Sequence, residues 1–275
     1  MGLRVNTNIA SLNAQRHMAN VTNRIQGNYS RLASGLRIAS AADDAAGLAI
    51  SERMRSQIRS FSVAARNAQD GLSLAQTAEG ALGEVSNILS RMRELAMQSS
   101  NGTLSGNDRT TIDAEFEELK SEINRIATET EFNGTALLEG TNTAITIQVG
   151  IDAGETIQLA MVDVQTGATG LNVAALDTAD QANAIIALGA IDTAIDTVNG
   201  ARGTLGAGQN RLSSTLRSIL NVRENLSAAE SRIRDVDVAS ETADLTKNSI
   251  MQQAAVSVLQ QANTQPQVAL SLLQG

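Results

Sequence analysis

The two ends of the chain repeat apolar residues at intervals of three and four, and this pattern constrains the fold more than any other feature. Near the N-terminus the apolar positions are Val5, Ile9, Leu12, Val21, Ile25, Tyr29, Leu32 and Leu36. Near the C-terminus they are Ile250, Ala254, Val258 and Ala262, with Met251, Ala255 and Leu259 beside them. Such stripes, on helices otherwise built from Gln, Asn, Ser and Ala, are typical of coiled-coil seams. Each stripe is too thin to fold alone, so both ends need partners.

Composition limits what the core can contain. Of the 275 residues, 42% are hydrophobic but only 1% are aromatic, so the core must be built from Leu, Ile, Val, Met and Ala. The single proline, Pro266, leaves the first 265 residues free of the strongest helix breaker, which favours very long helices. The chain has no cysteine, which excludes disulfides, zinc-thiolate sites and thiol nucleophiles.

Three long helices and one β-hairpin are predicted between the two ends. The helices are expected over about 43–100, 107–130 and 177–235, and the hairpin over about 144–164. The pair Asn133-Gly134 is expected to close the second helix, because both residues tolerate the left-handed conformation. At 1.5 Å per residue the third helix spans roughly 85 Å, which indicates a rod.

A row of glycines interrupts the third helix, at Gly200, Gly203, Gly206 and Gly208. A glycine-rich phosphate loop would need a preceding strand and a following Gly-Lys-Ser/Thr, and neither is present. Close helix packing or local bending is therefore the favoured interpretation. The predicted fold class is mainly α, an elongated rod of long antiparallel helices in coiled-coil packing with a small β-hairpin.

The net charge of −8 is distributed unevenly along the chain. Residues 1–60 hold eight Arg against three acids, whereas residues 101–200 hold sixteen acids against three bases. An acidic chain with so few aromatic rings is unsuited to binding nucleic acid. The N-terminal arginines are interpreted first as helix-surface charge, and second as partners of an acidic neighbour in an assembly.

The sequence offers little for chemistry or for membrane insertion. The one histidine, His17, has no metal ligands at helical spacing, and Asp43 and Asp44 are better placed as helix caps than as a catalytic pair. We expect no enzyme activity, catalytic residue, cofactor or metal. No apolar run approaches the roughly 18 to 20 residues of a membrane span, so no membrane insertion is expected. The start lacks a secretory signal layout, so any export is expected to use another route.

Several motifs in this chain resemble those of bacterial flagellin, in the order in which that family carries them. They are Leu32–Ile38, Asp43–Ser51, Gln76–Leu82, Arg91–Ala96, Thr130–Gly134, Asn225–Asp235 and Gln261–Asn263. The resemblance covers the whole chain. It implies a structural subunit that polymerises into the extracellular flagellar filament for swimming motility, exported through the flagellar type III apparatus without a cleaved signal peptide.

The resemblance also implies a domain organisation and a set of partners. Residues 1–40 and 236–275 would pair as an inner coiled-coil layer of the filament, and residues 41–235 would form an outer tube. Only about 45 residues separate the second and third long helices, so inserted outer domains are expected to be absent. The implied partners are further copies of the chain, an export chaperone, the filament cap and the hook-filament junction proteins.

Two groups of site residues follow from the stripes and the resemblance together. The inner-core assembly residues are Val5, Ile9, Leu12, Val21, Ile25, Leu32, Ile250, Ala254, Val258 and Leu259. Arg91, Leu95 and Glu115 match positions that contribute to recognition in flagellins sensed by a vertebrate Toll-like receptor. These three residues are the candidates for innate-receptor recognition.

Two other functions remain open at this point. A hook-filament junction protein of the same superfamily would also be elongated and exported, but it would not form fibres microns long. A cytosolic coiled-coil scaffold or chaperone would be recovered from cells stripped of their surface appendages.

Overall fold

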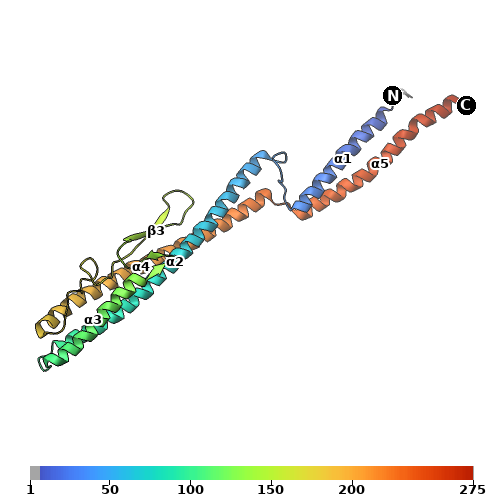
Figure 1. Ribbon diagram of the computed structural model, residues 1–275. Helices are drawn as coiled ribbons and strands as arrows, with labels where there is room; N and C mark the ends of the chain where they lie inside the picture. The colour runs from blue at the N-terminus through green and yellow to red at the C-terminus, as the bar shows by residue number, and fades with distance from the viewer. Residues whose placement is uncertain (1–6, 275) are drawn as a thin grey trace. The chain divides into compact units, whose positions relative to one another are not determined.

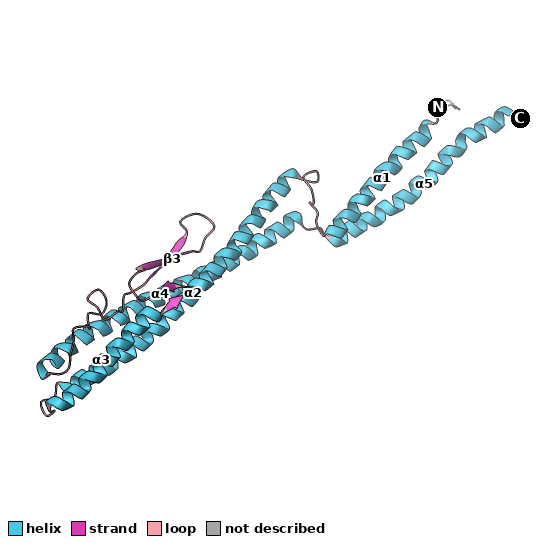
Figure 2. Cartoon of the chain, viewed as in Figure 1, coloured by secondary structure: helices cyan, strands magenta, loops and turns pink. Residues whose placement is uncertain are grey.

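The computed structural model describes residues 7–274, and the side chains as far as Thr264. Its described part is mainly α-helical, with two small antiparallel sheets (Figures 1 and 2). The helices are α1 (Ile9–Ser34), α2 (Ala45–Ser99), α3 (Gly106–Glu129), α4 (Gln181–Arg234) and α5 (Val238–Gln274). The strands are β1 (Glu131–Phe132), β2 (Thr135–Ala136), β3 (Ala144–Gln148) and β4 (Thr156–Ala160). The prediction of a mainly α fold with long helices and a small β-hairpin is confirmed.

Internal contacts divide the chain into two compact units. The terminal unit consists of residues 1–56 and 225–275, and the central unit of residues 57–224. The sequence placed this division after residues 40 and 235. The terminal unit extends further into α2 and α4 because those helix ends are tied to the terminal pieces: Arg37 N donates to Arg234 O, and Arg234 in turn pairs with Glu52.

The core of the central unit is formed by one face of each of α2, α3 and α4. On α2, Leu82, Val85, Leu89 and Met92 are fully buried, and their spacing of three, four and three keeps them on one side of the helix. Phe116 of α3 is the bulkiest side chain in this core. The aromatic-poor sequence therefore fills its interior with aliphatic side chains around one ring.

Two glycines let the β3–β4 hairpin lie directly on the helices. A Cβ atom at Gly71 of α2 would meet Ile147 Cδ1 at 2.1 Å, and one at Gly208 of α4 would meet Leu159 Cδ2 at 2.5 Å. In contrast, a Cβ at Gly200 would meet nothing within 4 Å, and the same holds at Gly203 and Gly206. Close packing therefore explains only the last glycine of the row.

The pair Asn133-Gly134 forms a hairpin turn, so the prediction that it closes the second helix is wrong. Helix α3 already ends at Glu129 with Thr130 in extended conformation. Asn133 and Gly134 both have positive φ, of 50° and 76°, and join β1 to β2. Two successive residues with positive φ are what a type I′ turn requires, and Asn-Gly is the preferred pair for it.

Lys120 of α3 fastens the irregular segment 161–180 to the central unit. Its side chain is almost fully buried, and Nζ donates to the carbonyl oxygens of Ala174 at 3.0 Å and Leu176 at 2.7 Å. The same ammonium pairs with Glu117 and lies 5.7 Å from the centre of the Phe116 ring. The charge is thus compensated by these protein groups.

Replacing Lys120 with methionine is expected to loosen this segment. The change keeps the apolar stem but removes two charge-assisted hydrogen bonds, which stabilise by roughly 1.5–3 kcal/mol each. Hydrogen exchange should become faster at the amides of residues 163–178. Arg125→Met on the same helix is the control, because Arg125 is exposed and should leave that exchange unchanged. Equal protection in both variants would contradict the assigned role of Lys120.

Helix α4 is more apolar than the sequence analysis anticipated. Among the described residues it is the one helix that could cross a membrane by length and composition, with a mean hydropathy of 1.2 over 18 residues. The apolar side chains include Ala184, Ala187, Ile191 and Val198, which are all fully buried in the central core. Only 28% of that 18-residue window is buried, and Ile185 and Ile186 are exposed, so packing in the core accounts for part of its apolar composition.

Candidate assembly surface on the terminal helices

Helices α1 and α5 lie side by side and antiparallel in the terminal unit (Figures 1 and 2). Helix α1 begins after Asn8, whose side-chain oxygen accepts a hydrogen bond from Ser11 N at 3.1 Å. It ends at Gly35, which has a φ of 70° and donates its N–H to Arg31 O. An Asx N-cap and a left-handed glycine C-cap therefore define the helix by local chemistry.

The contact between α1 and α5 follows heptad spacing on both helices, and all its members are buried or half-buried. On α1 the seam residues are Ser11, Ala14, Met18, Val21, Ile25, Asn28 and Leu32. On α5 they are Glu241, Leu245, Asn248, Gln252, Ala255, Leu259 and Ala262. Intervals alternate between three and four throughout, which is the geometry of a two-helix seam. Its side chains are small or polar far more often than in a stable isolated coiled coil.

A polar cluster of Asn28, Glu241 and Asn248 lies inside this seam. Asn28 Nδ2 donates to Glu241 Oε1 at 2.6 Å, and Asn248 Nδ2 donates to Asn28 Oδ1 at 2.8 Å. Asn28 is 5% exposed and Glu241 8%. Arg31, half-buried at the edge, places its guanidinium 3.6 Å from the same carboxylate oxygen. Polar residues at seam positions fix register at a cost in stability.

A second polar contact fixes the other end of the pair. Ser11 Oγ donates to Asn263 Oδ1 at 2.7 Å, and Asn8 Nδ2 donates to Ala262 O at 2.7 Å. These contacts lie far along α1 from Asn28, so the two helices are matched at two separated points. A shift of either helix by one residue would break both sets.

Several large apolar side chains of the terminal unit face outward. Ile9 is 56% exposed, Ile250 is 61% exposed and Val258 is 59% exposed. At 100° per residue, Ile250 and Ala254 fall on the side of α5 opposite the seam. The terminal unit therefore presents an apolar surface to its surroundings in addition to the apolar side chains of its seam.

The predicted inner-core residues consequently fall into two groups. Val21, Ile25, Leu32 and Leu259 are half-buried in the α1–α5 seam. Ile9, Leu12, Ile250, Ala254 and Val258 are exposed. Val5 lies outside the described residues.

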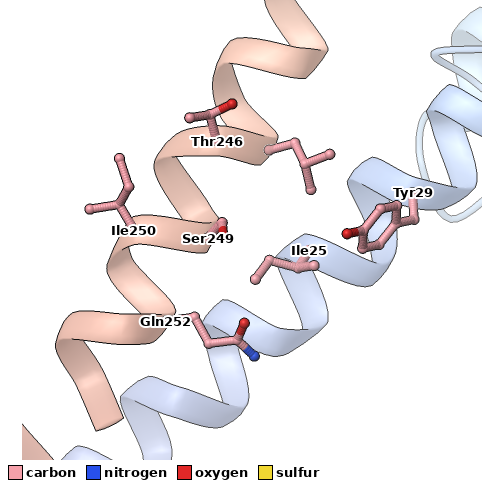
Figure 3. Close-up of a pocket in the computed structure, with 7 residues that line it drawn as sticks. Ile25, Tyr29, Thr246, Ser249, Ile250 and Gln252 are labelled. Atoms are coloured by element: carbon pink, nitrogen blue, oxygen red, sulfur yellow. The ribbon is translucent and has the colours of Figure 1, made fainter. Parts of the chain in front are cut away.

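Two grooves run along the α1–α5 pair. The first has a volume of about 310 Å³ and is lined by Ile25, Tyr29, Leu245, Thr246, Ser249, Ile250 and Gln252. Figure 3 shows Ile25 and Tyr29 on one helix and Ser249 and Gln252 on the other, while Ile250 projects from the far side of its helix. The second, of about 400 Å³, is lined by Ala10, Ser257, Val258, Gln261 and Ala262. Both are lined by apolar and uncharged polar side chains, which suits helical side chains of another protein surface better than a charged ligand.

The segment after α1 is tied to the end of α4. Leu36 forms an isolated antiparallel bridge with Asp235, and Arg37 N donates to Arg234 O at 2.7 Å. The Arg234 guanidinium in turn donates to Glu52 Oε1 at 2.5 Å, which holds the pKa of Glu52 below its ordinary value. The N- and C-terminal pieces are thereby joined at the base of the helix pair.

Asp44 caps the start of α2, as expected from the sequence, whereas Asp43 closes the turn that precedes the helix. Asp44 Oδ1 accepts from Ala46 N at 3.0 Å and from Gly47 N at 2.9 Å, at the start of α2. Asp43 Oδ2 accepts from Ser40 N at 2.9 Å, and this hydrogen bond lowers the pKa of Asp43. Both carboxylates are thus occupied by backbone amides.

The three receptor-recognition candidates lie in the central unit and differ in exposure. Arg91 Nε donates to Glu115 Oε1 at 2.9 Å, and both side chains are about half exposed. Leu95 is only 2% exposed and packs in the central core. The structure therefore places Arg91 and Glu115 together on the surface and Leu95 beneath them.

Sequence reasoning missed Asn28, Glu241 and Asn248 as seam residues. The signal that could have found Asn28 is its place in the row Val21, Ile25, Asn28 and Leu32, where it completes alternating steps of four and three. His17, the one histidine, is exposed. Among residues whose side chains are described, no three His, Asp or Glu gather as a metal site.

Comparison with known proteins identifies the family. Residues 5–143 match the bacterial flagellin N-terminal helical region, and residues 188–273 match the bacterial flagellin C-terminal helical region. A flagellin of Halalkalibacterium halodurans is 49% identical over 269 residues, which cover 98% of this chain and 99% of that protein.

Solved structures agree with this assignment. The crystal structure of Bacillus cereus flagellin is 39% identical, with a TM-score of 0.51, and the match covers 60% of this chain and 94% of that one. A protein from Vibrio parahaemolyticus described as flagellar hook-associated matches with a TM-score of 0.61 over 70% of this chain and 100% of that one. Its identity of 19% shows a shared fold alone, so it does not favour the junction alternative. The chain therefore belongs to the bacterial flagellin family, the structural proteins that build the bacterial flagellar filament, and it is not an enzyme.

Proposed function

We propose that copies of this chain join in the filament through the outward apolar faces of α1 and α5. The observation that supports this is the exposure of Ile9, Leu12, Ile250 and Val258 in a unit whose own seam is rich in small and polar side chains. Full burial of such a side chain stabilises by roughly 1.5–3 kcal/mol. Several of these per copy supply the apolar burial that the α1–α5 pair lacks by itself.

The two groups of predicted inner-core residues then have different roles. Val21, Ile25, Leu32 and Leu259 hold α1 to α5 within one copy. Ile9, Leu12, Ile250, Ala254 and Val258 contact neighbouring copies, and Val5 extends the same stripe. Because the contact joins unlike surfaces and does not close, repetition produces a helical fibre. Residues 1–40 and 236–275 form the inner layer, and residues 41–235 the outer tube.

The filament is extracellular, and the chain reaches it through the flagellar type III route without a cleaved signal peptide. The small and polar side chains of the seam support this proposal, because a helix pair with limited apolar burial separates at low cost. The export chaperone, the cap and the hook-filament junction proteins are its proposed partners besides further copies of itself.

We also propose that the Arg91–Glu115 pair is the surface through which a flagellin-sensing Toll-like receptor would recognise this chain. Leu95, buried in the core below, would position α2 rather than touch the receptor. Arg91→Ala should then weaken receptor activation, whereas Leu95→Met should not.

Electron microscopy of the purified full-length chain, seeded with fragments of its own filaments, tests the proposed function. Fibres microns long are expected, and the same chain should restore swimming in a strain that lacks its filament subunit. Short capped assemblies would favour a junction protein. Recovery of the chain only from cells stripped of appendages would favour a cytosolic scaffold or chaperone.

Replacing Leu259 with aspartate should prevent normal filaments by separating α1 from α5. The side chain is half-buried in the seam, where an unpaired carboxylate costs several kcal/mol. Limited proteolysis of the variant should cut the terminal helices faster than those of the natural chain. Leu259→Met is the control, since it keeps the volume and the apolar character. Normal filaments from the aspartate variant would mean that the seam is misplaced.

A further inference from the structure

The central unit is basic where α2 enters it and α4 leaves it. This basic stretch, residues 57–78 and 210–224, carries Arg59, Arg66, Arg211, Arg217 and Arg223. None of these arginines makes a salt bridge within the described part of the chain. Arg59 and Arg66 are both exposed and, seven residues apart, lie on one face of α2.

Acidic residues are few on this basic stretch. Asp70 and Glu224 are the only carboxylates of the two segments, and the hairpin turn nearby adds Asp152 and Glu155. None of the four forms an ion pair with the arginines among the described side chains. The guanidinium groups are therefore available to an outside partner.

The rest of the central unit is strongly acidic. The acidic half, residues 79–143 and 161–209, holds seventeen Asp and Glu against six Lys and Arg. Most of its cations are already paired inside the copy: Arg91 with Glu115, Arg93 with Asp192, Lys120 with Glu117 and Arg125 with Glu122. Glu118 and Asp196 are exposed carboxylates without a salt bridge among the described residues.

We propose that the basic stretch of one copy docks on the acidic half of a second copy of this chain, and so sets the stagger between neighbours. The inference rests on the proposed filament function and adds a contact surface on the central unit. From Arg66 to residue 90 on α2 is roughly 36 Å at 1.5 Å per residue. A parallel neighbour shifted by about that distance brings opposite charges together.

A second copy fits this surface because both halves of the complementary pair are on the same chain. A parallel neighbour in register would place arginine beside arginine and carboxylate beside carboxylate, which is unfavourable. An antiparallel neighbour would also match the charges, but that contact is isologous and closes as a dimer. The staggered parallel contact is heterologous and continues into a fibre.

Charge reversal in the full-length chain tests the docking. The first variant is Arg59→Glu with Arg66→Glu, the second is Glu118→Lys with Asp196→Lys, and the third combines all four changes. Elongation from natural seeds is followed by light scattering for the first two, and each should be about tenfold slower at low salt. The combined variant, seeded with its own fragments, should return to within about threefold of the natural rate, because complementarity is restored.

Salt supplies the second readout. The natural chain should elongate more slowly when NaCl rises from about 0.01 M to about 0.1 M, since the Debye length falls from about 30 Å to about 10 Å. The matched control, Arg59→Lys with Arg66→Lys, keeps both charges and should behave like the natural chain. Circular dichroism melting should show that every variant is folded.

Each outcome of these experiments supports or overturns the proposed docking. Natural rates in both reversed variants at low salt would overturn the docking, and so would a combined variant as slow as the separate ones. Closed dimers that the reversals abolish without slowing elongation would assign the charges to an antiparallel pair and overturn it too. A natural chain that forms no filaments would instead refute the proposed function, so the two failures are distinguishable.

Discussion

Replacing Ile250 with aspartate is expected to abolish filament growth at concentrations where the natural chain polymerises, while the monomer stays folded. The side chain is 61% exposed in the single copy, so the folded monomer loses little. In the filament the change forfeits roughly 1.5–3 kcal/mol of apolar burial and adds the cost of a buried carboxylate. A total near 4 kcal/mol raises the critical concentration by about 1,000-fold.

Sedimentation of polymer from monomer over a concentration series measures this effect. Thr242→Asp is the matched control, because it adds the same charge at an exposed polar position of the same helix. The control should polymerise at nearly the natural critical concentration. If Ile250→Asp also did so, the outward face of α5 would not be a contact between copies.

Periodicity predicted the central unit well because its helices bury their apolar faces within the chain. Leu82, Val85, Leu89 and Met92 are spaced by three, four and three, and all four are fully buried. In such a helix the face marked by the apolar spacing is also the face that packs in the core, so the sequence of a single chain is enough to predict it. The predicted helix bounds lie close to those in the structure for the same reason.

In the terminal helices, periodicity alone does not show what buries an apolar face. Ile250 and Ala254 lie on an apolar line of α5 that faces away from α1, and Val258 lines a groove beside Ala10 of α1. The face toward α1 carries Glu241 and Asn248 instead. Periodicity identifies a face that needs burial, but it cannot say whether the chain itself or a second copy provides the cover.

Contacts between distant segments were beyond the sequence because no local pattern encodes them. Lys120 reads as one more charge on an amphipathic helix, but its amine reaches the carbonyls of Ala174 and Leu176. The turn at Asn133-Gly134 was misread for a different reason. Positive φ suits both a helix end and a type I′ turn, and only the strands on either side decide between them.

Replacing Asn28 with leucine is expected to destabilise the α1–α5 pair strongly, because it removes the hydrogen-bond donor of a buried carboxylate. Glu241 would lose its 2.6 Å hydrogen bond and keep only Arg31 at 3.6 Å, while Asn248 would lose its acceptor. Breaking a buried polar set by removing one member costs roughly 3–5 kcal/mol. Proteolysis of α1 and α5 in the free chain should accelerate by about two orders of magnitude or more.

The triple change of Asn28, Glu241 and Asn248 to leucine separates stability from register. A seam of similar volume without this polar cluster is expected to protect α1 and α5 at least as well as the natural one, because no buried carboxylate remains in it. Register is then reported by Ser11→Cys with Asn263→Cys, which is unambiguous in a chain without other cysteines. The disulfide should form readily in the natural background and incompletely in the triple variant, whose leucines accept shifted pairings. Complete cross-linking in both would mean that the polar cluster does not set the register. Slower proteolysis with incomplete cross-linking would show that these buried polar side chains lower the stability of the helix pair and restrict it to one alignment.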